Sequence, residues 1–248
     1  MSYNKYDFKI EVGNELELDS SIYVNDKIKN KLSPLVILLH GWNNNKSELE
    51  YFIHSLLDKN YKVLSYSYRG HGNSNGERNL VDIFSDINKV IDYIVNLTPY
   101  ISDINLVGIS LGAAIALTQG YKNSKVSHIF ALNPYFNLKQ TLEECNNPIL
   151  QIYFKILAKK YNIEQVNNLL SPKYFIDPNN ISNKNRLYFV ITMNDSFVNI
   201  NQKIELLNFT KSPISNVKVF QDSNHTFDDI KDSVVKTVVN WLSAIYPG

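Results

Sequence analysis

The sequence has one cysteine, no long apolar run and almost no net charge, and each of these features excludes a class of protein. The single Cys145 rules out an intrachain disulfide framework and fits a reducing compartment. A formal charge of +1 gives no electrostatic reason to expect nucleic acid or an anionic membrane as a partner. No apolar run approaches the roughly 18 residues of a membrane span, and the charged N-terminus lacks a signal-peptide core. We therefore expect a cytoplasmic protein with no membrane span and no nucleic-acid partner.

Motifs for metals and nucleotides are also missing. The chain has no H-E-x-x-H, no cysteine cluster and no glycine-rich phosphate loop, and Cys145 stands in "LEECNNP" without metal-ligand spacing around it. We expect no metal and no cofactor. The hydrophobic content of 44% is ample for a core, and the 20% of charged residues is ordinary for an enzyme.

Strand and helix patterns alternate from end to end, with no linker-like segment between them. The alternating stretches "YDFKIEV" and "LELDSSIYV" predict two antiparallel strands, and the apolar run "LVILLH" predicts a strand buried on both faces. The further expected elements are a helix over 46–59, a strand over 62–68, a helix over 80–97, a strand over 104–109, a helix from Ser110, strands over 128–133 and 186–192, a short helix, a strand over 217–221 and a C-terminal helix ending near Tyr246. This order predicts the α/β class, with an eight-stranded, mostly parallel sheet and helices on both faces.

One segment, at about 135–185, has helical patterning but no strand. In its "PILQIYFKILAKKY", Pro148 suits a first helical turn, and the apolar side chains share one face at a spacing of 3.6 residues; these are Ile149, Ile152, Ile156 and Leu157. The helix either packs on the core or caps the strand ends and lines an apolar pocket. We favour the cap, because an insertion here has no sheet face left to cover. We thus expect residues 1–248 to form one domain with a helical cap insertion.

Two of the nine glycines flank a serine in Gly108-Ile109-Ser110-Leu111-Gly112, where a predicted strand becomes a predicted helix. A serine on so abrupt a turn is strained, and side chains at 108 and 112 would collide with the neighbouring strand or helix. The first N–H groups of the following helix favour a developing anion. The alternative is an ordinary helix N-cap serine, which the flanking glycines disfavour.

A nucleophilic serine needs a base, and the base needs an acid to hold its tautomer. His225 follows the strand at 217–221 and precedes a helix, which is where open α/β sheets place their chemistry. Asp195 follows the strand at 186–192 in the same way. Asp222 is the competing acid, and Asp177 before Pro178 is interpreted as a turn former. Of the other histidines, His54 and His128 are interpreted as structural, and His40 and His71 belong to short glycine motifs.

Together these motifs resemble the α/β-hydrolase fold enzymes over nearly the whole chain from Leu35. The segments that carry the resemblance are His40-Gly41-Trp42, Arg69-Gly70-His71-Gly72, the pentapeptide around Ser110, and the later Asp195 and His225, in the Ser, Asp, His order of that fold. The branch it is most similar to holds monoacylglycerol lipases, carboxylesterases, hydroxycinnamoyl esterases and serine aminopeptidase-like proteins.

The resemblance implies a Ser110-Asp195-His225 triad, with the backbone N–H groups of Trp42 and Leu111 as the oxyanion hole. It also implies that His40 shapes the pocket and that Arg69 and His71 support it from a structural turn. It implies a carboxylic ester hydrolase of the esterase or lipase type, acting on a small-molecule ester with a short to medium apolar acyl or aryl group. Amide or thioester hydrolysis by the same triad stays open, as does a non-catalytic binding protein of this fold. A homodimer is compatible with the sequence.

Overall fold

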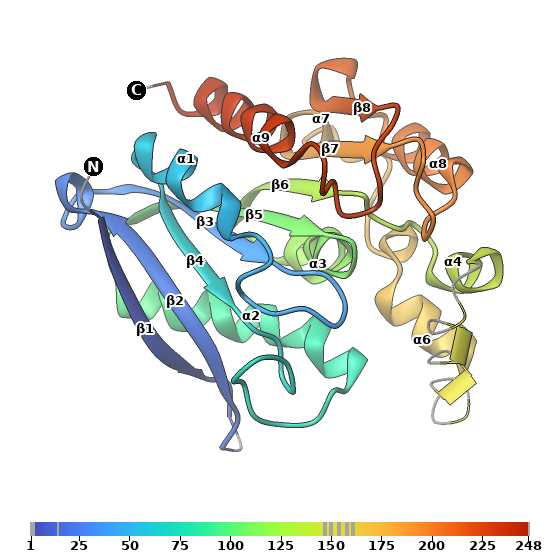
Figure 1. Cartoon of the computed structure of the whole chain (residues 1–248), viewed down its shortest axis with the longest axis horizontal. Helices are drawn as coiled ribbons and strands as arrows, with labels where there is room; N and C mark the ends of the chain where they lie inside the picture. Colours follow the sequence, from blue (N-terminus) through green and yellow to red (C-terminus); the bar gives the residue numbers. More distant parts are fainter. Residues whose placement is uncertain are drawn as a thin grey trace.

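The computed structural model describes residues 3–13, 15–145, 148, 151–152, 155–156, 159 and 162–247 of the chain. In this part of the chain, eight strands form one sheet in the order β1-β2-β4-β3-β5-β6-β7-β8 (Figure 1). The pairs β1–β2 and β2–β4 are antiparallel, and all other neighbouring pairs are parallel. The predicted fold class, an eight-stranded and mostly parallel α/β sheet, is confirmed.

The strands lie close to where the sequence pattern predicts them. Their bounds are β1 Tyr3–Glu11, β2 Glu17–Asn25, β3 Ser33–Leu39, β4 Lys62–Tyr66, β5 Ile101–Ile109, β6 Val126–Leu132, β7 Leu187–Thr192 and β8 Val217–Phe220. The central strands are buried almost throughout, as expected of parallel strands covered on both faces. Because β3 to β8 are parallel, their carboxyl ends share one edge of the sheet.

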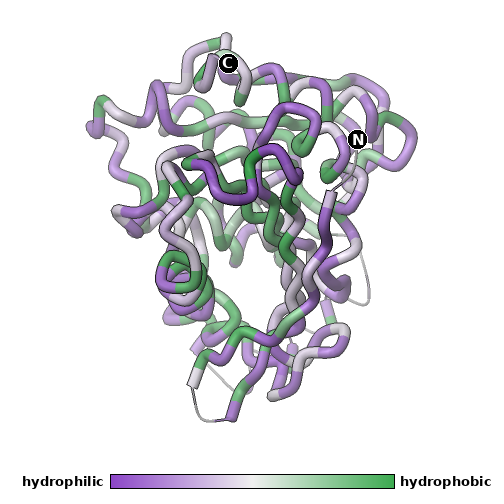
Figure 2. The backbone as a smooth tube through the Cα atoms, turned by 90° about the vertical axis from the view of Figure 1, so that its left-hand side faces the viewer, coloured by the Kyte–Doolittle hydropathy of each residue, from purple (hydrophilic) through white to green (hydrophobic). Residues whose placement is uncertain are grey.

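Helices cover both faces of the sheet. The longer ones are α2 Leu80–Leu97, α8 Ile200–Thr210 and α9 Lys231–Ile245; the shorter ones are α1 Ile53–Asp58, α3 Leu111–Ile115, α4 Leu138–Glu144, α6 Ile163–Leu170 and α7 Asn183–Arg186. Side chains of α2 and α3 pack in one core cluster, and those of α1 and α9 pack in a second cluster on the opposite face. Figure 2 shows hydrophobic segments crossing the middle of the molecule, with hydrophilic loops around them.

The helix predicted over 46–59 begins later than expected. Turns occupy residues 46–49, a 3-10 turn η2 follows at Glu50–Phe52, and α1 starts only at Ile53. The backbone N–H of Lys46 donates to Ser67 Oγ, and Asn45 Oδ1 accepts from the Ser47 N–H. These polar contacts give the segment an alternative to helical hydrogen bonds, so the prediction of helix from residue 46 is wrong.

The region at 135–185 contains α4, α6, a 3-10 turn η4 at Pro172–Tyr174 and α7, and its described residues contain no strand. Of the apolar face predicted around Pro148, Ile149 and Leu157 lie outside the described residues, while Ile152 and Ile156 are 59% and 58% exposed. In the described ranges, no helix combines the length and apolarity that crossing a bilayer requires.

Candidate active site

Ser110 lies on a sharp turn between β5 and α3. Its φ of 53° and ψ of −112° are a strained combination for a residue with a side chain. A Cβ on Gly108 would lie 2.4 Å from the carbonyl of Gly112, and a Cβ on Gly112 would lie 2.1 Å from the carbonyl oxygen of Leu39 at the end of β3. Both glycines are therefore required by backbone contacts, as the spacing around the serine predicts.

The Gly112 contact leads to a stability prediction. Gly112→Ala should lower the free energy of unfolding by about 3 kcal/mol, because the new methyl group meets strand backbone that cannot move aside. Gly120→Ala is the matched control, since its Cβ would meet only the Cδ1 end of the Leu106 side chain at close range. Urea denaturation of both variants measures the difference. Equal losses would show that the close approach of α3 to β3 is not the constraint.

His225 and Asp195 form a hydrogen-bonded pair beyond the ends of β7 and β8. The Nδ1 of His225 lies 2.8 Å from both carboxylate oxygens of Asp195. A carboxylate only accepts hydrogen bonds, so Nδ1 carries the proton and Nε2 keeps a lone pair. The ring of Phe197 packs against the imidazole with 4.8 Å between centroids. The structure thus holds the histidine in the tautomer that a general base needs.

The carboxylate of Asp195 is fully buried and has further donors. Its Oδ1 accepts the backbone N–H groups of Phe197 at 2.8 Å and Val198 at 3.0 Å, and its Oδ2 accepts from Lys203 Nζ at 2.6 Å. Burial opposes ionisation of this carboxyl, but the hydrogen bonds and charges of His225 and Lys203 outweigh it and hold the pKa of Asp195 well below its usual range. Asp195 is therefore an anion throughout the physiological pH range.

Ser110 and His225 line one cavity of about 320 Å³. Most of its other lining side chains are apolar; they include Leu80, Ile109, Tyr135, Leu138, Leu142, Phe197 and Val198. Trp42 and Leu111, whose backbone N–H groups are the predicted oxyanion donors, line the same cavity. The structure therefore brings four of the five predicted site residues to one cavity, and the fifth, Asp195, lies directly behind His225.

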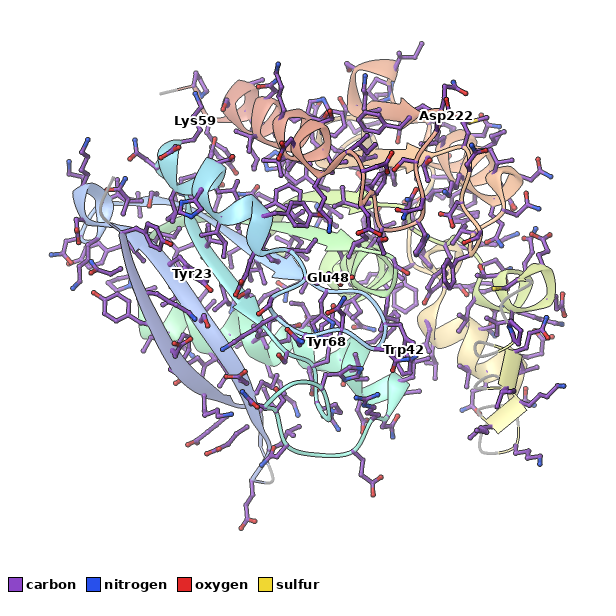
Figure 3. The ribbon with its side chains drawn as sticks, viewed as in Figure 1. Tyr23, Trp42, Glu48, Lys59, Tyr68 and Asp222 are labelled. Carbon is purple, nitrogen blue, oxygen red and sulfur yellow. The ribbon has the colours of Figure 1, made fainter. Side chains whose placement is uncertain are left out.

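The loop after β3 is held by contacts at both of its ends. His40 is buried, donates from Nδ1 to the carbonyl of Gly41 at 2.7 Å and accepts the N–H of Tyr68 at Nε2 at 3.1 Å. Burial lowers the pKa of His40 to about 3, so its ring is only weakly basic, and the Nε2 lone pair already accepts the Tyr68 N–H. Glu48 accepts the N–H of Gly41 at 2.5 Å, immediately before Trp42. In Figure 3, Glu48, Tyr68 and Trp42 are drawn around this loop.

The segment Arg69-Gly70-His71-Gly72 is a fixed turn beside the loop. The guanidinium of Arg69 makes two 2.7 Å hydrogen bonds to Asp86 and one of 2.8 Å to Asp82, both on α2. His71 is fully buried, and its ring meets the Trp42 indole edge-on at 5.6 Å between centroids. These contacts fit the supporting role that the resemblance implies for Arg69 and His71.

The rival candidates lie elsewhere. Asp222 is exposed, accepts a hydrogen bond from Asn194 and lies beside β8, apart from Trp42 and Glu48 (Figure 3). Asp177 accepts the N–H of Asn179 in a turn. His54 is an exposed residue against Tyr3, and His128 contacts Asn105 and Tyr246. Within the described ranges, no group of three or more His, Cys, Asp or Glu side chains has the geometry of a metal site.

Two residues of the site are missed by sequence reasoning, namely Glu48 and Lys203. Glu48 is the carboxylate among the described residues that line the cavity, but its sequence surroundings predict only a position in the helix expected over 46–59. Lys203 is fully buried on the same face of α8 as Leu206 and Thr210. A lysine at an inward position of an amphipathic helix is a signal that could have identified it.

The sheet order, the serine turn and the hydrogen-bonded histidine at the carboxyl ends of the strands are features of the α/β hydrolases. In agreement, the model of a family described as serine aminopeptidase, S33, matches residues 30–188, more than half of the chain. The protein belongs to this family.

Similar proteins are found among curated sequences and solved structures. The chain is 33% identical over 84 residues to the uncharacterized protein YqkD of Bacillus subtilis (strain 168), and the match covers 33% of this chain but only 28% of that protein. The esterase Pf2001 of Pyrococcus furiosus is 22% identical with a TM-score of 0.72, over 98% of this chain and 90% of that chain. Est1E from Butyrivibrio proteoclasticus, solved with ferulic acid bound, is 15% identical with a TM-score of 0.70, over 96% and 98% of the two chains. At these identities, the two solved structures confirm the α/β-hydrolase fold.

Proposed function

We propose that the protein is a serine hydrolase that cleaves carboxylic esters with short to medium acyl or aryl groups through a Ser110-His225-Asp195 triad. The observation that carries this proposal is the position of Ser110, strained at a positive φ, in the same cavity as a His225 whose Nδ1 is held by a buried Asp195. Family membership supports a hydrolase. Of the two similar solved structures, Pf2001 is named an esterase, and Est1E was solved with ferulic acid bound.

The first chemical step is acylation. Ser110 Oγ attacks the ester carbonyl carbon while His225 Nε2 takes the hydroxyl proton, and the backbone N–H groups of Trp42 and Leu111 donate to the oxyanion. The tetrahedral intermediate collapses, the C–O bond to the alcohol breaks, and the imidazolium returns its proton to the leaving oxygen. Asp195 stabilises the imidazolium and stays ionised throughout. The product of this step is an acyl-serine and a free alcohol.

The second step is deacylation. His225 Nε2 takes a proton from a water molecule as the water oxygen attacks the acyl carbon. The attack forms a second tetrahedral intermediate, whose oxyanion accepts from the same two N–H groups. The bond to Ser110 Oγ then breaks, the serine recovers its proton from the imidazolium, and the acid leaves. The net reaction consumes one ester and one water and yields one acid and one alcohol.

The cavity wall favours an uncharged acyl group. The described residues that line it include no lysine and no arginine, and most of its surface is aliphatic or aromatic. Tyr135, Leu138, Thr141 and Leu142 belong to the insertion after β6, and they line this cavity. We propose that this insertion is the cap predicted from the sequence and that it shapes the acyl or aryl subsite.

Hydrolysis of aminoacyl amides is the second candidate, favoured by one observation. Glu48 places a carboxylate in the cavity, where it would attract a substrate ammonium group. However, its Oε2 already accepts the Gly41 N–H, and burial raises the pKa of Glu48, which disfavours the charged form. The ester therefore remains the first candidate. A cytoplasmic location, suggested by the single cysteine, and the absence of a cofactor stay predictions of the sequence.

A fluorophosphonate probe tests the proposed nucleophile. The activated serine displaces fluoride and forms a covalent phosphonyl ester, whereas an ordinary surface serine does not react. We expect one adduct per chain, mapped by peptide mass spectrometry to the segment containing Ser110, and loss of labelling after heat denaturation. A folded protein that takes no label, or takes it at another residue, would contradict the triad.

A substrate panel then separates the two candidates. The panel holds p-nitrophenyl esters from acetate to palmitate, an aryl ester and an aminoacyl p-nitroanilide. We expect the short to medium esters to have the highest kcat/KM, because a cavity of about 320 Å³ is at the small end of ligand sites. A higher kcat/KM for the anilide would favour the aminopeptidase-like alternative.

A further inference from the structure

A buried lysine lies directly behind the Asp195–His225 pair. Lys203 on α8 is fully buried, and its Nζ is 2.6 Å from Asp195 Oδ2, 2.9 Å from the carbonyl oxygen of Thr192 and 2.9 Å from Asn133 Oδ1. An ammonium group has three N–H donors, and here each of them has one acceptor. A neutral amine would have only two donors for the same three oxygens. The geometry therefore points to a charged Lys203.

The same lysine is linked to both members of the pair. Asn133, which accepts from Lys203, also accepts the Thr192 N–H at 2.8 Å and donates from Nδ2 to the carbonyl of His225 at 2.8 Å. Lys203 thus contacts Asp195 directly, and it is linked to the His225 backbone through the side-chain amide of Asn133. A long cationic side chain is rarely buried completely unless it is paired. Burial lowers the pKa of Lys203, and the contact with Asp195 opposes that effect.

We propose that Lys203 is a positioning residue whose charge offsets that of Asp195 and thereby keeps His225 unprotonated, and able to act as a base, to lower pH. This inference rests on the proposed function, in which His225 accepts the proton of Ser110. Lys203 makes no contact with the substrate in this proposal. Its side chain binds Asp195, which in turn binds His225, and Lys203 is not among the cavity-lining residues.

The sign of the effect follows from the charges around the imidazole. A lone buried carboxylate would strongly favour the imidazolium, whereas a carboxylate paired with an ammonium carries no net charge as a unit and favours it less. Glu48, from the segment before η2, faces His225 from another wall of the cavity. Removing the Lys203 charge leaves the buried Asp195 carboxylate beside His225 without its cationic partner. Protonation of His225 should then occur at higher pH.

The test compares Lys203→Gln and Lys203→Met with the wild-type protein. Glutamine keeps a hydrogen-bond donor toward Asp195 but has no charge, and methionine removes both. We expect the acid limb of the kcat/KM profile for a p-nitrophenyl ester to move up by about one pH unit in both variants. At a pH below this limb, the variants should retain a fraction of their plateau kcat/KM that is about tenfold smaller than the fraction the wild type retains. A glutamine profile that overlays the wild-type one would overturn the role of the charge.

Lys173→Met is the matched control. Lys173 pairs with Glu205 on the solvent side of the same helix, at 2.9 Å, with both side chains partly exposed. Its removal changes the net charge equally but leaves the buried pair intact, so the acid limb should not move. An equal movement in this control would show that overall charge, not the buried contact, sets the profile.

Two further measurements keep the proposal testable if activity or folding is lost. The pH titration of the His225 imidazole resonance by NMR needs no substrate, so the absence of ester turnover would overturn the proposed function and leave this test intact. If Lys203→Met does not fold, the double variant Asp195→Asn with Lys203→Met should, because it removes the unpaired buried charge. A double variant no more stable than Lys203→Met would overturn the charge pairing.

Discussion

Replacing Ser110 by alanine is expected to lower kcat for a short p-nitrophenyl ester by about a million-fold, while the protein stays folded. Without Oγ no acyl-serine forms, and His225 and the two backbone donors have no nucleophile to activate. The residual rate reflects only binding and oxyanion stabilisation of direct attack by water. Stopped-flow or long-time absorbance assays, with circular dichroism to verify folding, measure the effect.

The control for this variant is Ser85→Ala. Ser85 is exposed on α2 and its hydroxyl donates to the carbonyl of Asp82, so the variant should retain wild-type turnover. A Ser110→Ala protein that keeps more than about a hundredth of the wild-type kcat would contradict acyl-enzyme catalysis at this residue. Ser110→Gly should be equally inactive but about 1 kcal/mol more stable than Ser110→Ala, since glycine adopts a φ of 53° without strain.

Much of the fold could be predicted because its elements are strongly periodic. The helix predicted over 80–97 matches α2 at both ends, and Asn79 fixes its start by accepting from the Val81 and Asp82 N–H groups. The start of the helix expected over 46–59 is not predictable in this way, because the first residues of this segment form hydrogen bonds outside it. The Lys46 N–H donates to Ser67, and Glu48 accepts from the Gly41 N–H. Hydrophobic period carries no information about such tertiary hydrogen bonds.

The candidate site shows the same division. Ser110, Asp195 and His225 each follow a strand of the parallel sheet, so their convergence at one edge is a consequence of topology that the order of elements already contains. Whether Asp222 or Asp195 reaches the imidazole depends on loop geometry, which the order of elements does not contain. Glu48 and Lys203 were missed, since each acts through a contact with a residue that no local pattern links to it.

Replacing Asp195 by asparagine should lower kcat by about ten-thousand-fold with little change in the position of His225. An amide has one acceptor and one donor end, whereas the partners of Asp195 are all donors: the His225 Nδ1–H, Lys203 Nζ and the N–H groups of Phe197 and Val198. Lys203 and the backbone compete for the amide oxygen.

The amide nitrogen introduced at position 195 then faces groups that are themselves donors: the imidazole, the ammonium or the two backbone N–H groups. Where this nitrogen donates to Nδ1, the imidazole carries its proton on Nε2 instead. A protonated Nε2 cannot accept from Ser110, which explains the loss of rate. The unpaired buried donors should also lower the free energy of unfolding by about 2 kcal/mol, measured by urea denaturation. Asp222→Asn is the control: its carboxylate is exposed and contacts Asn194, so turnover and stability should remain those of the wild type. If Asp222→Asn lost activity and Asp195→Asn kept it, the acid of the triad would be Asp222.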